Sequence, residues 1–138
     1  MSTIQRLYES DHIDICHDSR GWLYVDWKGQ QTTESVKAGC ERMLELLKQT
    51  GVSKVLNDNT HVIGTWQGAA TWVGTDWLPR MRAAGLRHFA WVQSSSEPSR
   101  KSANQSLFDA EADGVLLFNE VPSAAVWLRA VDRVKQDR

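Results

Sequence analysis

The sequence lacks the features that mark several large classes of protein. Its longest apolar runs are about as short as residues 115–118, far below the roughly 18 residues that cross a bilayer. Residues 1–11 contain no apolar segment typical of a secretory signal, so we expect a cytoplasmic protein with no integral membrane segment. Cys16 and Cys40 form no CxxC motif, and we expect free buried thiols, although a disulfide between them is possible.

A strong excess of one charge is also missing. The formal net charge is -1 and the isoelectric point is about 6.4, which argues against nucleic acid as a partner. Residues 79–101 are locally basic, with five basic residues against Glu97: Arg80, Arg82, Arg87, Arg100 and Lys101. This stretch predicts either an ordinary solvated face or a modest patch for an anionic ligand or partner.

Motifs of common enzymes and cofactor sites are absent too. The chain has no P-loop, no Rossmann glycine pattern and no G-x-S-x-G elbow. Asp58 and His61 could ligate a metal, but two ligands do not make a site. We therefore predict no catalytic residue, no metal and no cofactor.

The 138 residues that are present suit one globular domain, 1–138. Hydrophobic residues make up 41% and charged residues 24%, a balance that supports a buried core. Tryptophan is unusually frequent, with seven residues against two tyrosines and three phenylalanines. Any functional hypothesis has to account for this surplus.

Apolar periodicity predicts alternating strands and helices. A hairpin is expected over residues 13–27, and further strands over 52–56, 86–92 and 114–118. Helices are expected after Thr32 or Thr33 up to Gly51, over 64–84, over 101–110 and from Pro122. Because helices connect the later strands, those strands should be parallel. The predicted fold is α/β, a four- or five-stranded mixed sheet with helices packed on it.

The helix expected over residues 64–84 is rich in tryptophan. One of its faces collects Trp66, Ala70, Val73, Trp77, Met81 and Ala84, which is most simply a core face. Pro79 predicts a kink, or a helix that stops near Gly74 and restarts at Asp76. Trp72 lies off this face, and Trp22 is also poorly explained by packing. We interpret both as aromatics of an interface or a pocket.

Polar residues follow the predicted strands and could converge on one edge of the sheet. The candidate ligand-binding residues are Lys28, Asn57, Asp58, Asn59, Thr60, Thr65, Ser94 and Ser95. Backbone amides near Gly64 and Thr65 open a helix and would suit an anion. The alternative interpretation is that these residues only form turns and caps.

Six segments resemble the bacterial SpoIIAA-like branch of STAS-fold proteins, also labelled STAS/SEC14-like. They are Trp27-Lys28-Gly29, residues 55–59, Gly64-Thr65-Trp66, Trp77-Leu78-Pro79, Ala84-Gly85-Leu86 and residues 124–128. The resemblance covers nearly the whole chain. It implies a compact α/β domain that is usually not an enzyme and that binds a protein partner or a small apolar ligand.

The sequence departs from that family at its phosphorylation motif. The anti-sigma antagonists carry Asp-Ser-Ser/Thr-Gly after the strand that precedes the second helix, whereas this chain has Asn57-Asp58-Asn59-Thr60-His61. Thr60 and Thr65 could replace the phosphorylated residue, but the Ser-Gly pair is missing.

Three hypotheses follow. The first is a non-catalytic regulatory or interaction domain, forming a homodimer or binding a protein through an apolar patch that includes Trp72. The second is a carrier of a small apolar ligand or lipid, with an internal cavity that opens near Asn57–Thr60. The third is an enzyme that uses Asp58 with Ser94 or His61.

Overall fold

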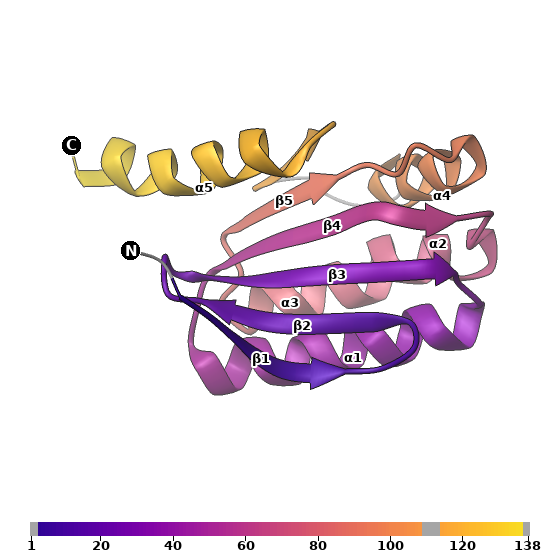
Figure 1. The fold of residues 1–138 in the computed structure, drawn as a ribbon, viewed down its shortest axis with the longest axis horizontal. Coiled ribbons are helices and arrows are strands. Elements are labelled where there is room, and N and C mark those ends of the chain that lie inside the picture. The colour runs from indigo at the N-terminus through magenta and orange to yellow at the C-terminus, as the bar shows by residue number, and fades with distance from the viewer. Residues whose placement is uncertain (1–2, 109–113, 137–138) are drawn as a thin grey trace.

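One mixed β-sheet, whose strands follow the order of the chain, organises the protein. The computed structural model describes residues 3–108 and 114–136. The sheet order is β1-β2-β3-β4-β5-β6 (Figure 1). The strands are β1 (Ile4–Glu9), β2 (Ile13–Asp18), β3 (Trp22–Gln30), β4 (Lys54–Ile63), β5 (His88–Val92) and β6 (Val115–Phe118). Neighbours among β1–β3 are antiparallel, and neighbours from β3 to β6 are parallel.

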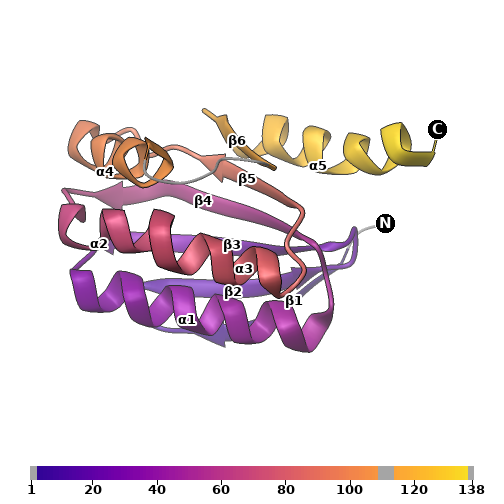
Figure 2. The same ribbon diagram turned by 180° about the vertical axis from the view of Figure 1, so that it is seen from behind.

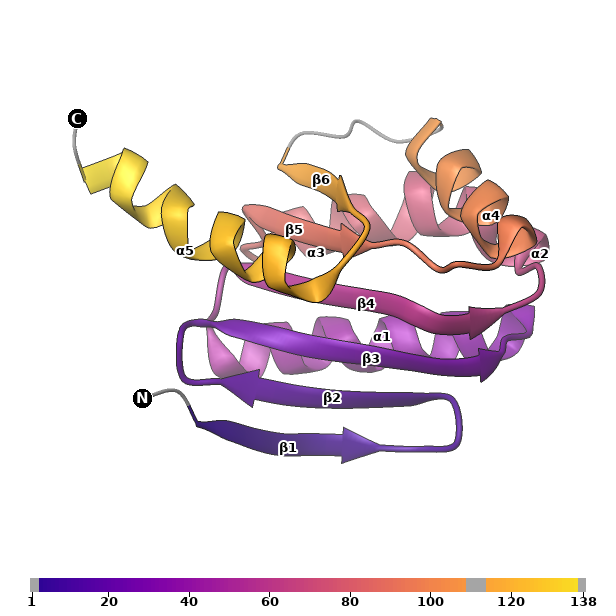
Figure 3. The same ribbon diagram turned by 45° about the horizontal axis from the view of Figure 1, so that its top comes forward.

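Helices cover the two faces of the sheet unequally. They are α1 (Thr33–Thr50), α2 (Gln67–Trp72), the π-helix η1 (Val73–Trp77), α3 (Leu78–Ala83), α4 (Glu97–Phe108) and α5 (Val121–Gln136). α1, α2, η1 and α3 lie on one face (Figure 2), with α4 beside α2 and η1. α5 lies on the other face, over β4–β6 (Figure 3). In the described part of the chain, no helix is long and apolar enough to cross a membrane.

The α/β prediction is confirmed, but the predicted strand number is wrong. The sheet has six strands instead of four or five, because β1 adds to the edge beside β2. Sequence periodicity missed β1 since an edge strand buries little: Ile4 is 60% exposed, and Arg6 and Glu9 are also exposed. Backbone pairing to β2, rather than side-chain burial, makes this segment a strand.

The strand predicted at 52–56 is also longer than expected. β4 extends through Ile63, so residues 57–60 lie within the strand rather than in a loop after it. Its second half pairs with the end of β3, where Gln30 lies opposite Ile63. Asn and Asp disfavour strands on average, but here cross-strand pairing and buried hydrogen bonds outweigh that preference.

The predicted ends of α1 are confirmed. Thr32 is the N-cap: its Oγ1 accepts a hydrogen bond from the backbone N–H of Ser35, and the Ser35 hydroxyl accepts one from the N–H of Thr32. Gly51 ends the helix with a φ of +72°, a conformation that glycine adopts without strain. α4 begins at Glu97, earlier than predicted, since Pro98 fits a first helical turn. Its predicted end at residue 110 lies outside the described residues.

Two hydrophobic cores lie on opposite faces of the sheet. The larger one, between the sheet and α1, α2, η1 and α3, contains Trp27, Trp66, Trp77 and Trp91. The smaller one lies under α5 and contains Trp22, with Trp127 partly buried against it. The predicted core face of the tryptophan-rich helix is therefore confirmed, and most of the tryptophan surplus packs inside the protein.

Candidate functional site

A pocket penetrates the larger core at the carboxyl ends of the parallel strands. Its space is about 370 Å³ when open solvent at the mouth is included, and its interior has room for about two water molecules. We call it the tryptophan pocket; its lining residues are Trp27, Gln31, Val36, Cys40, Met43, Asn57, Asn59, Val62, Trp66, Val73, Trp77, Phe89 and Trp91. Carboxyl ends of parallel strands are where open α/β sheets commonly bind ligands.

Strand periodicity explains how distant residues meet in this pocket. Side chains two apart on a strand point to the same face, so Asn57 and Asn59 both face α1. In the parallel register Asn57 lies opposite Trp91 of β5, which points the same way. A β-bulge gives β4 one extra residue between Asp58 and His61, which turns Val62 back into the pocket.

The helical wall of the pocket is shaped by η1. Pro79 has no N–H to bond to Thr75, as the sequence indicated. The helical segment does not stop near Gly74, because a π-helical turn accommodates the proline: the N–H of Leu78 donates to the carbonyl of Val73, five residues back. This turn supplies Val73 and Trp77 to the pocket.

Three of the four indole N–H groups in the pocket lining are hydrogen-bonded within the protein. Trp27 Nε1 donates to Asn57 Oδ1 at 2.8 Å. Trp77 Nε1 donates to the Cys40 carbonyl at 2.7 Å, and Trp66 Nε1 donates to Ser99 Oγ at 3.3 Å. Trp91 is 2% exposed, and its Nε1 is buried with no hydrogen-bond partner among the described residues. Buried donors are normally paired, and Trp22 Nε1 in the smaller core is a second exception.

Of the eight predicted ligand-binding residues, two line this pocket: Asn57 and Asn59. Asp58 and Lys28 point to the opposite face, because each is one position away from a pocket residue on its strand. Thr60 is exposed and its backbone N–H donates to Asp58. The expected single polar edge is therefore split between two faces of the sheet.

The predicted residues beyond β4 serve local structure. Ser94 is buried, donates to the Val62 carbonyl and accepts from the backbone N–H of Ser96, while Ser95 is exposed. Thr65 Oγ1 lies 3.2 Å from Ser102 Oγ.

The proposed anion position at the start of α2 is occupied by the protein's own hydroxyls. The N–H of Gly64 donates to Ser96 Oγ, and that of Trp66 donates to Ser102 Oγ. The basic stretch is partly neutralised as well, since Arg80 pairs with Glu41 and Asp76. These contacts already satisfy the two amides, and the anion site stays a prediction from the sequence.

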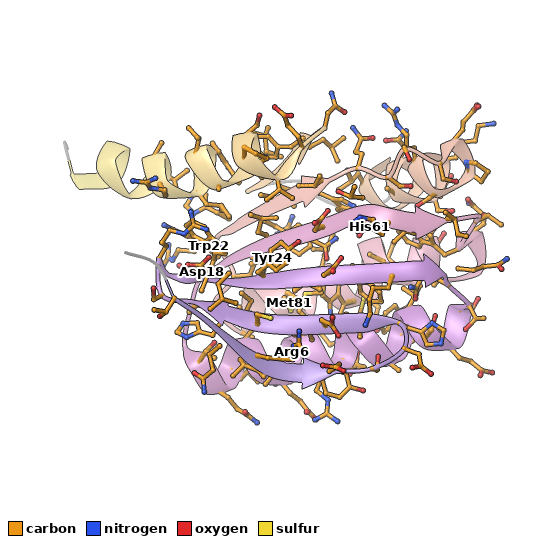
Figure 4. The ribbon with its side chains drawn as sticks, in the orientation of Figure 1. Arg6, Asp18, Trp22, Tyr24, His61 and Met81 are labelled. Carbon is orange, nitrogen blue, oxygen red and sulfur yellow. The ribbon has the colours of Figure 1, made fainter. Side chains whose placement is uncertain are left out.

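Trp22 does not line the tryptophan pocket. It is fully buried under α5, with the Arg20 guanidinium 4.5 Å from its ring centroid, and Figure 4 shows it near the start of β3. The sequence could not reveal this because α5 closes that face from more than 90 residues away. Trp72 is half-buried, between Lys37 at 5.4 Å and Arg80 at 5.6 Å from its ring.

On the sheet face where α5 lies over β4–β6, a row of carboxylates runs across β2–β4. Asp14 lies opposite Asp26, and Asp26 lies opposite Asp58. Tyr24 donates to Asp58 at 2.6 Å, and His61 lies 3.7 Å from Asp26; Figure 4 shows Tyr24 and His61 on this face. Burial, followed by the Asp58 charge, raises the pKa of Asp26. Burial and the hydrogen bond to Asp58 raise the pKa of Tyr24.

The positions of these residues do not support the enzyme hypothesis or a metal site. Asp58 is bonded to Tyr24 and Thr60, whereas Ser94 bonds the Val62 carbonyl. Within residues 3–108 and 114–136, no three His, Cys, Asp or Glu side chains are grouped to hold a metal. Cys16 and Cys40 are free and buried, as expected.

Sequence reasoning missed most of the pocket lining. Trp27 was assigned to the end of a strand and Cys40 to a buried position, and Gln31 was given no role. Gln31 is buried, donating to the carbonyls of His12 and Lys28, and closes one side of the pocket. One signal could have indicated part of the pocket: Asn57 and Asn59 are spaced by two, so they share a face if their segment is a strand, as it is.

Comparison of the chain with protein-family models, with curated proteins and with solved structures gives no match.

Proposed function

We propose that this protein is a small-molecule binding domain whose ligand occupies the tryptophan pocket. The observation that carries the proposal is a pocket in the larger core whose lining combines four tryptophans with the amides of Asn57 and Asn59. Protein cores are normally packed to crystal density. An apolar pocket with a few polar groups in its lining is therefore the default position for a ligand.

The type of wall indicates an apolar ligand. Aromatic and aliphatic side chains form most of the surface, and the polar ones are amides rather than charged groups. This supports the second hypothesis from the sequence, an apolar-ligand module of the STAS/SEC14-like kind whose cavity would open near Asn57–Thr60. A regulatory role would then follow if binding altered a partner surface.

Ligand binding can be tested with intrinsic fluorescence, because four tryptophans line the pocket. Toluene, cyclohexanone, acetophenone and indole are titrated into the protein, and the emission is recorded. Val73→Phe, which fills the pocket, should abolish the response. Val126→Phe adds the same bulk at a site that is 66% exposed and should leave it unchanged. No spectral change with any compound, or an equal response in Val73→Phe, would contradict the proposal.

Self-association is a second candidate, favoured by the apolar edge at β6. This strand ends the sheet, and Leu116 and Leu117 are 45% and 37% exposed. Edge strands present unpaired backbone groups and tend to pair with another strand. Two copies could therefore join by antiparallel pairing of β6.

Sedimentation velocity over a concentration series tests this second candidate. Leu116→Glu should shift a dimer to monomer, whereas Ile4→Glu at the opposite edge should not. A wild-type chain that stays monomeric at the highest concentration would exclude the β6 dimer.

A further inference from the structure

We propose that the β6 edge binds a second copy of this chain in one fixed register, in which the two Leu116 side chains face each other across a twofold axis. This inference rests on the proposed function in its second form, self-association through β6, and adds the alignment of the two strands. It follows from the direction of the backbone groups on β6, from its apolar side chains, and from the contrast with the other edge of the sheet.

Hydrogen bonds to β5 fix which backbone groups of β6 face outward. The carbonyls of Gly114 and Phe118 accept hydrogen bonds at 2.7 and 2.9 Å from N–H groups in and just after β5. Backbone groups of successive residues in a strand alternate between its two sides, so those of Leu116 also point toward β5. The N–H and C=O groups of Val115 and Leu117 therefore point away from the sheet, at an edge where no further described strand pairs.

One alignment pairs all of these outward groups within β6 itself. In an antiparallel ladder, two residues that exchange both of their hydrogen bonds lie directly opposite each other. If Val115 lies opposite Leu117 of the second copy, symmetry places Leu117 opposite the second Val115, and every outward donor has an acceptor. With Leu117 opposite itself, Val115 would instead fall beyond the end of the partner strand, because β6 ends at Phe118.

The same alignment covers the exposed apolar side chains of β6. Leu116 lies opposite Ala90 in the parallel register, on the α5 face of the sheet, and is 45% exposed. Leu117 lies opposite Trp91 on the other face and is 37% exposed. At the twofold axis the two Leu116 residues form a non-hydrogen-bonded pair, the kind in which cross-strand side chains approach most closely.

The opposite edge of the sheet carries protections that β6 lacks. On β1, Arg6 and Glu9 form an exposed ion pair, and a β-bulge between Arg6 and Tyr8 interrupts the pairing with β2. Charges and bulges of this kind keep edge strands from pairing with other chains. β6 contains no charged residue, and its register with β5 has no bulge. The fold therefore protects one edge and leaves the other open to strand pairing.

The lack of charge in β6 favours an identical partner. Two copies of a charged strand would place like charges opposite each other, which destabilises a sheet. A neutral strand centred on Leu116 meets its own copy without that repulsion, and a twofold interface uses the same surface on both chains. The product is one continuous sheet made of two six-stranded halves, joined at the edge where Figure 3 shows β6.

Disulfide cross-linking tests the alignment. Leu116→Cys should form a covalent dimer under mild oxidation, because the Cα atoms of a non-hydrogen-bonded pair are about 4.5 Å apart, within disulfide range. Leu117→Cys is the matched control: its two copies are diagonal neighbours about 7–8 Å apart in this register, so cross-linking should be about tenfold slower. The wild-type chain should not cross-link, since Cys16 and Cys40 are buried.

Amide hydrogen exchange followed by NMR tests the pairing without a variant. The N–H groups of Val115 and Leu117 should exchange about tenfold more slowly at a high protein concentration than at a low one, because dimerisation supplies their acceptors. The N–H of Leu116 already points toward β5 and should change less.

The outcomes separate this inference from the proposed self-association. If Leu117→Cys cross-links as fast as Leu116→Cys or faster, or if Leu116→Cys dimerises without cross-linking, the register is wrong although the β6 dimer stands. If sedimentation velocity shows a dimer but the exchange of Val115 and Leu117 does not depend on concentration, the copies associate through another surface and the inference is wrong. A wild-type chain that stays monomeric, with no cross-linking in either variant, would overturn self-association itself.

Discussion

Replacing Gly74 with alanine should destabilise the protein, because the added methyl group would collide with the backbone of α4. Gly74 lies in η1, and a Cβ built there would be 2.1 Å from the Ser106 carbonyl oxygen and 3.0 Å from its carbon. The obstacle is backbone of α4, which cannot rotate away as a side chain would. η1 and α4 would have to separate by about 1 Å, since real Cβ contacts are essentially never under 3.0 Å.

The size of the effect follows from two opposing contributions. Alanine in a helix is favoured over glycine by about 1 kcal/mol. Forcing a methyl group into a packed core costs about 1–3 kcal/mol, and contact with rigid backbone places this site at the upper end. We therefore expect the free energy of unfolding to fall by about 1–2 kcal/mol.

Gly68→Ala provides the matched comparison. Its Cβ would meet Thr33 Oγ1 at 2.4 Å, but that hydroxyl is the end of a side chain that can change rotamer. Gly68 is also exposed and helical, so the alanine should be neutral or stabilising by up to about 1 kcal/mol.

Urea denaturation of the three proteins, followed by circular dichroism, measures these differences. Acetophenone titration of Gly74→Ala adds a second readout, because η1 carries two pocket residues and its displacement should weaken binding. If Gly74→Ala is as stable as Gly68→Ala, the contact between η1 and α4 leaves room for a methyl group at Gly74, and the prediction is wrong.

Three further predictions concern the sheet and its caps. Asp26→Asn should raise the free energy of unfolding at pH 7, because the pKa of Asp26 is raised in the folded protein and stability is therefore lost as pH rises through that pKa. Denaturation from pH 3 to 8 should show that the difference between the two proteins vanishes below the unfolded pKa near 3.8. A pH-independent difference would contradict this prediction. Asn57→Leu should lower the free energy of unfolding by about 1–3 kcal/mol, since it leaves the Trp27 N–H unpaired; adding Trp27→Phe should recover part of that loss in a double-mutant cycle, and strict additivity would exclude the coupling. Thr32→Ala should cost about 1 kcal/mol by removing the α1 cap. Thr3→Ala is the control in the same denaturation experiment, because Thr3 is exposed and bonds Ser19 through its backbone.

Local features of the fold were predictable from sequence because short-range interactions decide them. A capping threonine followed by Ser35, a glycine at the helix end and apolar residues at helical spacing fix α1 without reference to the rest of the chain. The same periodicity correctly assigned Trp66 and Trp77 to a core face. The order of strands and helices then implied parallel pairing, which the sheet shows.

The candidate site was only partly predictable, because residues far apart in sequence build it. Asn57 and Asn59 were identified as candidates, but with neighbours that strand alternation sends to the other face, such as Asp58. No local pattern says that Trp27 donates to Asn57, 30 residues away, or that Trp91 is left without an acceptor.

By itself, the sequence determined the α/β class, the capped first helix and the burial of most tryptophans, since each depends on residues within a few turns of one another. Tertiary structure alone decided the edge strand β1, the length of β4, the burial of Trp22 under α5 and the pocket. Those features depend on strand register and on which helix covers which face, and backbone pairing between distant segments sets both. The tryptophan surplus is therefore mainly packing, and four of the seven tryptophans line the pocket.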